Sequence, residues 1–310
     1  MAGKLMRLVA VLVKEETTQN TDSVPLAANA ILARVSDAQP VMAEFADRQN
    51  LMPYLGHSGS VAVSVHSEIT IEFELAGTAA AGTVPGWAPL LKACGFGETV
   101  VASTSVTYKP ISTAFKWVTC YYYLDGLLHK MVGSVGNPSI SLNSRSIPVC
   151  TVKLTGLYSA TTDTTMISGT DYSAFQIPQA VNKINTQAYT LGGVSAAFDT
   201  FSVDLNNEVV YRNMPTLEEV IITDRKPTGQ ISIQMTTVAT KPWHQLALNG
   251  TLQAMSMAHG SGAGKTITIS APKVQLTDPQ YADKDGVVML NLGMKFMPDL
   301  GNDELSIALT

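Results

Sequence analysis

The chain is poor in charged residues: Lys, Arg, Asp and Glu make up 15% of its 310 residues, against about 25% in a typical soluble domain. Such residues usually cover solvated surface, so their scarcity predicts that much of the surface lies against other copies of the chain. The net charge of −5 argues against a protein that coats DNA, because coating requires clustered cations that displace the counterions of the phosphates.

Cysteines and long apolar runs are also scarce. The three cysteines, Cys94, Cys120 and Cys150, lie among apolar or aromatic neighbours and predict buried thiols rather than a disulfide framework. No stretch of about 20 apolar residues occurs, which argues against a membrane-spanning helix. The apolar residues 5–13 are followed at once by charged ones, so we expect no secretory leader.

One glycine-rich run, Gly260-Ser-Gly-Ala-Gly-Lys-Thr266, is similar to a phosphate-binding loop but lacks its first glycine. That glycine should stand five residues before Gly264, where the chain has His259. We expect a helical segment before the run and a strand after it, the reverse of the order that a phosphate-binding loop requires. The run therefore predicts a flexible loop.

Other catalytic or metal-binding patterns are missing. The five histidines lack the spacing of a metal site, and no Gly-x-Ser-x-Gly elbow occurs. Glu68, Glu72 and Glu74 fall on one strand face, where two of them could form an acid–base pair, but we interpret them as a solvated or lumen-facing acidic stripe. The sequence thus predicts a protein that is not an enzyme, with no catalytic, cofactor-binding or metal-binding residues.

The most informative pattern that is present is an order of elements that occurs twice. Residues 60–75 alternate between apolar and polar side chains and are followed by a helix-length segment that begins at Trp87. Residues 228–235 and Trp243 repeat this order. Duplicated units tend to occupy equivalent places in a ring or array, so the repeat favours a role in assembly.

Alternation within residues 60–75 assigns side chains to two faces of a strand. Val61, Val63, Val65, Ile69, Ile71 and Phe73 share one face. The opposite face carries Ser64, His66, Glu68, Thr70, Glu72 and Glu74.

The rest of the chain predicts short strands with one helix in each unit. Trp87, Leu90, Leu91 and Cys94 form an amphipathic helical stripe, and Gly95 stands where a helix would end. Asp125-Gly126 between apolar runs predicts a hairpin. Further strands are expected at residues 5–13, 104–108, 115–124, 149–157, 197–205, 219–224, 230–235, 265–270, 271–276, 286–296 and 304–309. Such spacing is typical of β-sandwiches or barrels, so we expect a mainly β chain of two tandem units.

We place the first unit, with an N-terminal arm, at residues 1–165 and the second, with a crossover segment, at residues 166–310. The arm, residues 1–50, has too few apolar residues for its own core and should pack on a neighbouring element or chain. Residues 159–195, rich in Thr, Ser, Gly and Asn, are expected to be a partly ordered crossover.

These ordered segments resemble the major tail tube proteins of long-tailed, siphovirus-like bacteriophages. The run Trp87-x-x-Leu-Leu-x-Ala-Cys-Gly-Phe96 is the most diagnostic part. The resemblance also covers residues 14–25, 105–112, 123–129, 149–157 and 223–229. It implies a non-enzymatic virion protein, assembled in the host cytoplasm, whose rings stack around a channel for DNA. It also implies tape measure, tail terminator and distal tail proteins as partners.

By the same resemblance, relatives with one unit per chain form hexameric rings, so two units predict a trimeric, pseudo-six-fold ring. Ser64, His66, Glu68, Thr70, Glu72 and Glu74 are candidates for the lumen face. An acidic or neutral lumen would let DNA pass without specific binding. The arm and residues 77–86 are expected to bridge successive rings, ordering as the rings stack.

Two other functions stay open. One is a different ring or baseplate component of a tail, which would cap one ring instead of polymerising. The other is a β-sandwich binding module such as an adhesin, which would expose aromatic platforms, whereas Trp87 and Trp243 lie on helical stripes. An enzymatic interpretation has only the defective glycine-rich loop in its favour.

Overall fold

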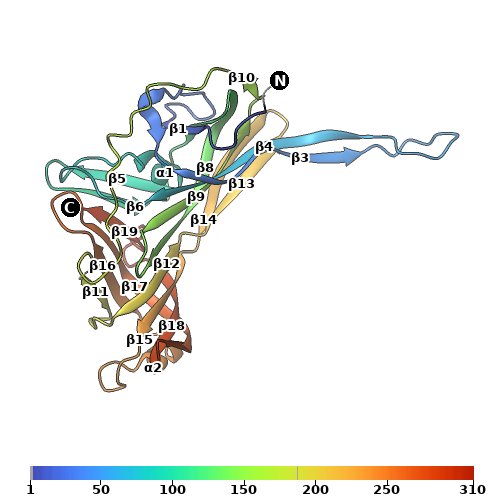
Figure 1. The fold of residues 1–310 in the computed structure, drawn as a ribbon. Helices are drawn as coiled ribbons and strands as arrows, with labels where there is room; N and C mark the ends of the chain where they lie inside the picture. The colour runs from blue at the N-terminus through green and yellow to red at the C-terminus, as the bar shows by residue number, and fades with distance from the viewer. Residues whose placement is uncertain (1–2, 187) are drawn as a thin grey trace.

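The computed structural model describes residues 3–186 and 188–310 and is mainly β, as predicted (Figure 1). Antiparallel strands form nearly all of its regular structure, with two short α-helices and one 3-10 helix, Ala27–Asn29. The two helices begin beside the tryptophans that the sequence singled out.

In the first half of the chain, four strands form a sheet in the order β3-β4-β9-β8. The bounds are Arg34–Asp47 for β3, Ser60–Glu74 for β4, Leu127–Asn143 for β8 and Val149–Tyr158 for β9. Strand β8 is long enough to leave this sheet and enter a second one, where it pairs with β7 and β10. Strand β7 pairs with β1, and β1 with β2. These four strands are Val9–Glu15 (β1), Ala30–Ile31 (β2), Val118–Leu124 (β7) and Thr162–Asp163 (β10).

The second half repeats this strand order. Its sheet runs β12-β15-β18-β17, and the long strand β17 again continues into a second sheet with β16, β11 and β19. The bounds are Ala188–Leu191 (β11), Phe198–Asp204 (β12), Thr228–Gln234 (β15), Gln253–His259 (β16), Ile267–Lys284 (β17), Val287–Met297 (β18) and Ser306–Leu309 (β19). In each half the helix follows the second strand of the four: α1, Ala88–Ala93, after β4 and α2, Trp243–Leu248, after β15.

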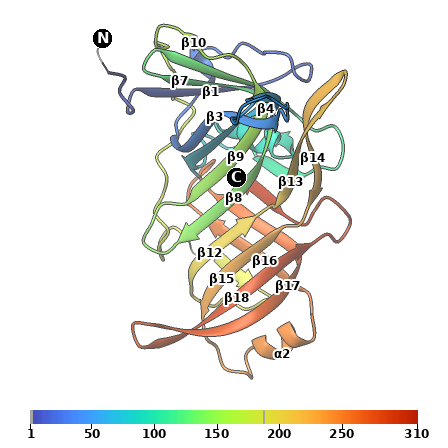
Figure 2. The ribbon, with the colours of Figure 1, turned by 90° about the vertical axis from the view of Figure 1, so that its right-hand side faces the viewer.

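Among the described residues, two strand pairings join the halves. Strand β8 pairs with β12, with Ile140 opposite Val203, so that the two four-stranded sheets become one of eight strands. Figure 2 shows the strands from β9 to β18 side by side. A hairpin of the first half, β5 (Phe96–Val101) and β6 (Ser105–Pro110), reaches β19 of the second. A single buried cluster therefore extends from Val11 to Leu309.

Trp87 and Trp243 lie in the core, each at the start of a helix. The indole nitrogen of Trp87 donates to the Ala76 carbonyl at 3.0 Å, and that of Trp243 donates to the Thr236 hydroxyl at 2.9 Å. Leu90, Leu91 and Cys94 are buried on the same helical stripe as Trp87. Gly95 ends α1 with φ +79°, a conformation that favours glycine. The predicted stripe and its C-terminal glycine are confirmed, and neither tryptophan offers an exposed platform.

The Asp125-Gly126 turn is also confirmed. It joins β7 to β8, and both residues have positive φ, 42° and 85°. This is the turn that matches the twist of two antiparallel strands.

The N-terminal segment packs on a neighbouring element, as expected, but it is part of the first sheet system and not a separate arm. Strand β1 pairs with β7 over seven residues and buries Val11, Leu12 and Val13, so it belongs to the core. Its few apolar residues suffice because β7 supplies the other side of the contact. Within residues 3–50, the part that projects from the body is the outer end of β3, in the hairpin that it forms with β4 (Figure 1). Residues 77–86 also pack within the chain: the Thr78 amide donates to the Gly264 carbonyl at 2.7 Å.

Three smaller expectations differ from the structure, and a fourth is confirmed with an addition. Residues 267–276 belong to one strand, β17, whose ladder with β16 continues past Pro272 through a register shift. The segment before Gly260 is a strand, β16, and not a helix. The strand expected at residues 219–224 is present as β14 (Leu217–Arg225), which forms a hairpin with β13 (Asn207–Met214). The described part of residues 159–195 is held by backbone bonds such as that from the Val181 amide to the Ser146 carbonyl, 2.8 Å.

Candidate functional site

The eight-stranded sheet has an apolar face that packs on the core and a polar face turned away from it. On β4, Ile69, Ile71 and Phe73 are buried, while Thr70 and Glu72 between them are not. On β15, Ile231 and Ile233 are buried and Ser232 is not. Because β-strand side chains alternate between faces, the polar residues of all eight strands form one continuous surface.

Ser64, His66, Glu68, Thr70, Glu72 and Glu74 all lie on this polar side of β4, and none of them is buried. The Arg34 guanidinium pairs with Glu72 at 2.6 Å, and the Lys153 ammonium pairs with Glu68 at 2.9 Å. The predicted acidic stripe is therefore partly neutralised by cations from β3 and β9. That these six residues line a channel stays a prediction.

One end of the polar face is covered by the β13–β14 hairpin. The Tyr211 ring lies 4.8 Å from the His66 ring, centroid to centroid. The Tyr211 hydroxyl donates to the Val65 carbonyl at 3.1 Å. His66 is thus enclosed within the chain, while Thr70, Glu72 and Glu74 lie farther from this hairpin along β4.

Sequence reasoning missed the rest of the polar face because it followed only one strand. The other strands contribute mainly neutral side chains, which alternate with buried ones. These are Ser139 and Ser141 on β8, Thr151 and Lys153 on β9, Thr200 and Ser202 on β12, Gln230 and Ser232 on β15, and Asn291 and Lys295 on β18. The same alternation in residues 197–205, 230–235 and 286–296 was a signal that could have found most of them.

The eight-stranded sheet ends in two open edges. In the described part of the chain, β3 pairs only with β4, and residues 277–284 of β17 pair only with β18. A register shift interrupts each edge, at Pro40 on β3 and at Pro279 on β17. Prolines and bulges at an edge limit uncontrolled strand addition, so these edges are suited to a selected partner.

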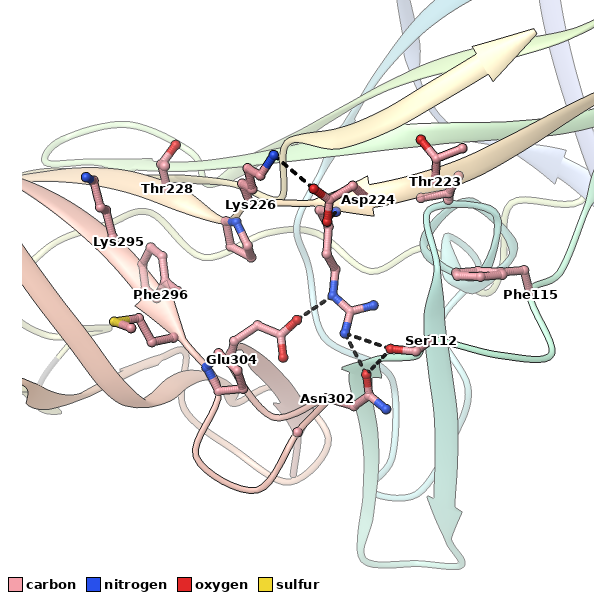
Figure 3. A pocket seen from close by; sticks show the side chains of 16 residues that line it. Ser112, Phe115, Thr223, Asp224, Lys226, Thr228, Lys295, Phe296, Asn302 and Glu304 are labelled. Carbon is pink, nitrogen blue, oxygen red and sulfur yellow. Dashed lines mark hydrogen bonds and ion pairs between the residues drawn. The ribbon is translucent and has the colours of Figure 1, made fainter. Parts of the chain in front are cut away.

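A groove of about 830 Å³ lies where β14 and the end of β18 approach each other (Figure 3). Lys226, Lys295 and Met297 lie along it, with Phe115 and Ile222 as apolar neighbours. At its floor the Arg225 guanidinium pairs with Glu304 and donates to the Ile111 carbonyl. The bond to Ile111 ties β14 to the first half of the chain.

The glycine-rich run connects two strands, β16 and β17, and therefore does not lead into a helix that could bind phosphate. His259 before it is buried, with Nε2 at 2.9 Å from the Gln179 carbonyl oxygen and Nδ1 at 2.7 Å from the Thr186 hydroxyl. Burial lowers the pKa of His259. A neutral imidazole that donates from Nε2 and accepts at Nδ1 satisfies both contacts, so this histidine is structural.

The three cysteines are free and buried, as predicted. Burial raises the pKa of the Cys120 thiol to about 12 and also raises those of Cys94 and Cys150. Thiols in such surroundings are unreactive. Across residues 3–186 and 188–310, no three His, Cys, Asp or Glu side chains converge on a possible metal position, and neither helix is long enough to cross a membrane.

Comparison with known proteins provides a family for this arrangement. No curated protein matches the chain. The family model described as phage tail tube protein matches residues 6–295, a range that includes both helices and all of the joined sheet except the last two residues of β18. The chain therefore belongs to the phage tail tube protein family and is a structural protein of the virion tail.

Proposed function

We propose that three chains close into a pseudo-six-fold ring, and that stacked rings form the wall of a channel through which DNA leaves the virion. The observation that carries this proposal is the duplicated four-stranded sheet, joined within the chain by the β8–β12 pairing and open at both ends. In the ring, β17 of one chain would pair with β3 of the next, as β8 pairs with β12.

The internal junction also predicts the register between chains. Leu290 on β18 corresponds to Cys150 on β9. Tyr281 pairs with Leu290, and Ile140 pairs with Cys150, so Tyr281 takes the place in β17 that Ile140 has in β8. Ala38 takes the place in β3 that Val203 has in β12. Because Ile140 lies opposite Val203, Ala38 of one chain is expected opposite Tyr281 of its neighbour.

The number of strands supports three chains. Eight strands per chain give twenty-four for a trimer, and strands about 4.8 Å apart with a tilt of about 40° then close at a backbone diameter of about 50 Å. Inward side chains would leave a lumen wide enough for a DNA duplex. A closed barrel of one chain would be filled by its own side chains, and six chains would double the diameter.

The polar face suits a channel that DNA crosses without being held. Most of its side chains are Ser, Thr, Asn or Gln, and the acids Glu68 and Glu72 are paired with cations. A nearly neutral wall makes few contacts with phosphates, so binding would be weak and movement fast. We assign Thr70, Glu72 and Glu74 to the lumen on this ground, together with the neutral side chains of the other strands.

The remaining parts of the proposal come from the family. The protein would assemble in the host cytoplasm and contact the tape measure, tail terminator and distal tail proteins, and it would have no enzymatic activity. The two quasi-equivalent units would divide near residues 165 and 166, between β10, which pairs in the first half, and β11, which pairs in the second.

Electron microscopy of the purified protein, with classification of end-on views, tests this function. Hollow tubes built from three-fold rings are the expected result. Tubes with six chains per ring would keep the channel function but refute the use of both units as ring positions. A protein that stays monomeric at high concentration, even with tail initiator proteins added, would refute tube formation.

A further inference from the structure

The outer half of the β3–β4 hairpin, residues 42–66, extends away from the body of the chain (Figure 1). Its apolar side chains are left in solvent: Phe45 is 62% exposed and Val61 and Val63 are each 55% exposed. A two-stranded hairpin is marginally stable by itself in water, and exposed apolar side chains on it indicate a surface that becomes covered.

The second half contains a counterpart of this hairpin, β13–β14, and there it is docked. Both hairpins have a register shift at the same place. In the first, Glu44 pairs with Ser64 and Phe45 with Ala62. In the second, Glu208 pairs with Asp224 and Val209 with Ile222. The shared bulge makes Phe45 equivalent to Val209, Asp47 to Tyr211 and Ser60 to Val220.

The docked hairpin covers the ends of β8, β9 and β4. Val220 is buried with Val135 and Leu157, and Val209 and Ile222 pack against this cluster. Tyr211 reaches His66, which pairs with Leu157 across the β4–β9 ladder. The receiving surface in the first half is therefore centred on Leu157 and His66.

The equivalent surface in the second half is open. By the matching ladders, Met297 on β18 corresponds to Leu157 on β9, and Lys226 corresponds to His66. Leu157 is 8% exposed and Met297 is 40% exposed. The His66 side chain is 19% exposed and that of Lys226 is 78% exposed. Met297 and Lys226 both line the groove of Figure 3.

We propose that this groove is the docking site for the β3–β4 hairpin of a second copy of the chain. The inference rests on the proposed ring, which brings the first half of one chain beside the second half of another. The hairpin would cross β17 and β18 of its neighbour as β13–β14 crosses β8 and β9. Phe45 would meet the apolar side of the groove, and the carboxylate of Asp47 would face the Lys226 ammonium in the position where Tyr211 faces His66.

Thiol cross-linking in assembled tubes tests the docking. Ser60→Cys with Met297→Cys places thiols at the counterparts of Val220 and Leu157, which share one buried cluster. The native thiols are buried and will not compete. A short bis-maleimide is expected to yield covalently closed trimers, while each single variant stays uncross-linked. Val61→Cys with Met297→Cys is the matched control, because Val61 lies on the opposite side of the hairpin.

Three results would contradict the proposal in distinguishable ways. Wild-type-like tubes in which Ser60→Cys and Met297→Cys do not cross-link would refute the docking and leave the ring intact. Equal cross-linking by the Val61→Cys control would refute the face assigned to the hairpin. If the wild-type chain forms no tubes under any condition, the ring itself fails and the docking fails with it. Covalent hexamers would support the docking while refuting the three-fold ring.

Discussion

Replacing Phe45 by Ala should weaken assembly without weakening the folded chain. Phe45 is 62% exposed on the projecting hairpin, so within one chain its ring stabilises little. On docking, we expect it to become buried, as its counterpart Val209 packs against the cluster around Val220.

The size of the effect follows from the exposed area of the ring. A buried Phe contributes about 150–250 Å² of surface, so truncation to Ala removes roughly 80–100 Å² of newly buried apolar area. At about 25 cal/mol per Å² this is about 2 kcal/mol for each contact between chains. The association constant of each contact should fall about 30-fold.

The assay measures the lowest protein concentration at which tubes form, detected by light scattering and electron microscopy. The thermal midpoint of the unassembled chain is the control for folding. Phe45→Ala should raise that concentration and leave the midpoint unchanged. Val61→Ala is the comparison, since Val61 is similarly exposed on the other side of the same hairpin. A lowered midpoint, or equal effects of the two variants on assembly, would refute the reasoning.

Three further predictions concern the folded chain. Burial raises the pKa of Glu16, so the wild-type chain loses stability as pH rises above the ordinary value of 4.5 and through the folded pKa. The uncharged Glu16→Gln variant should therefore gain stability relative to wild type as pH rises through this range, measured by urea unfolding. Its retained oxygen can still accept from Thr119 and Gly133, and a pH-independent difference would contradict this. Because the pKa of His259 is lowered in the folded chain, the free energy of unfolding should fall as pH drops below about 6.5. His259→Gln should make the urea midpoint less dependent on pH in this range. His57→Gln is the control, because His57 is exposed. Leu90→Ala should lower the free energy of unfolding by about 2–5 kcal/mol in the same assay, because Leu90 is fully buried. A decrease of less than about 1 kcal/mol would show that α1 is not anchored in the core.

Much of the local structure could be predicted because it depends on neighbours in the chain. Alternating side chains identified β4, the spacing of Trp87, Leu90 and Leu91 identified α1, and Asp125-Gly126 identified a hairpin. Each signal arises from the period of a strand or helix, or from the backbone preferences of two adjacent residues. The repeated strand-then-tryptophan order showed the duplication in outline.

Alternation by itself does not show which strand lies beside which. It placed Glu68 and Glu72 on the face opposite Ile69 and Ile71, but not beside Lys153 and Arg34. The pairing of β8 with β12 joins residues far apart in the sequence, and only the tertiary structure determines it. The same is true of β1, whose apolar residues looked too few for a core until β7 supplied the opposing surface.

The sequence by itself determined the mainly β class, the two helices with their buried tryptophans and the polar side of β4. Periodicity along the chain is sufficient for these features. Only the tertiary structure decided that the two sheets join, that their outer edges stay open and that one hairpin is docked while its counterpart, with Phe45, projects. These features depend on contacts between distant residues, and a pattern of neighbouring side chains does not encode the partner of such a contact.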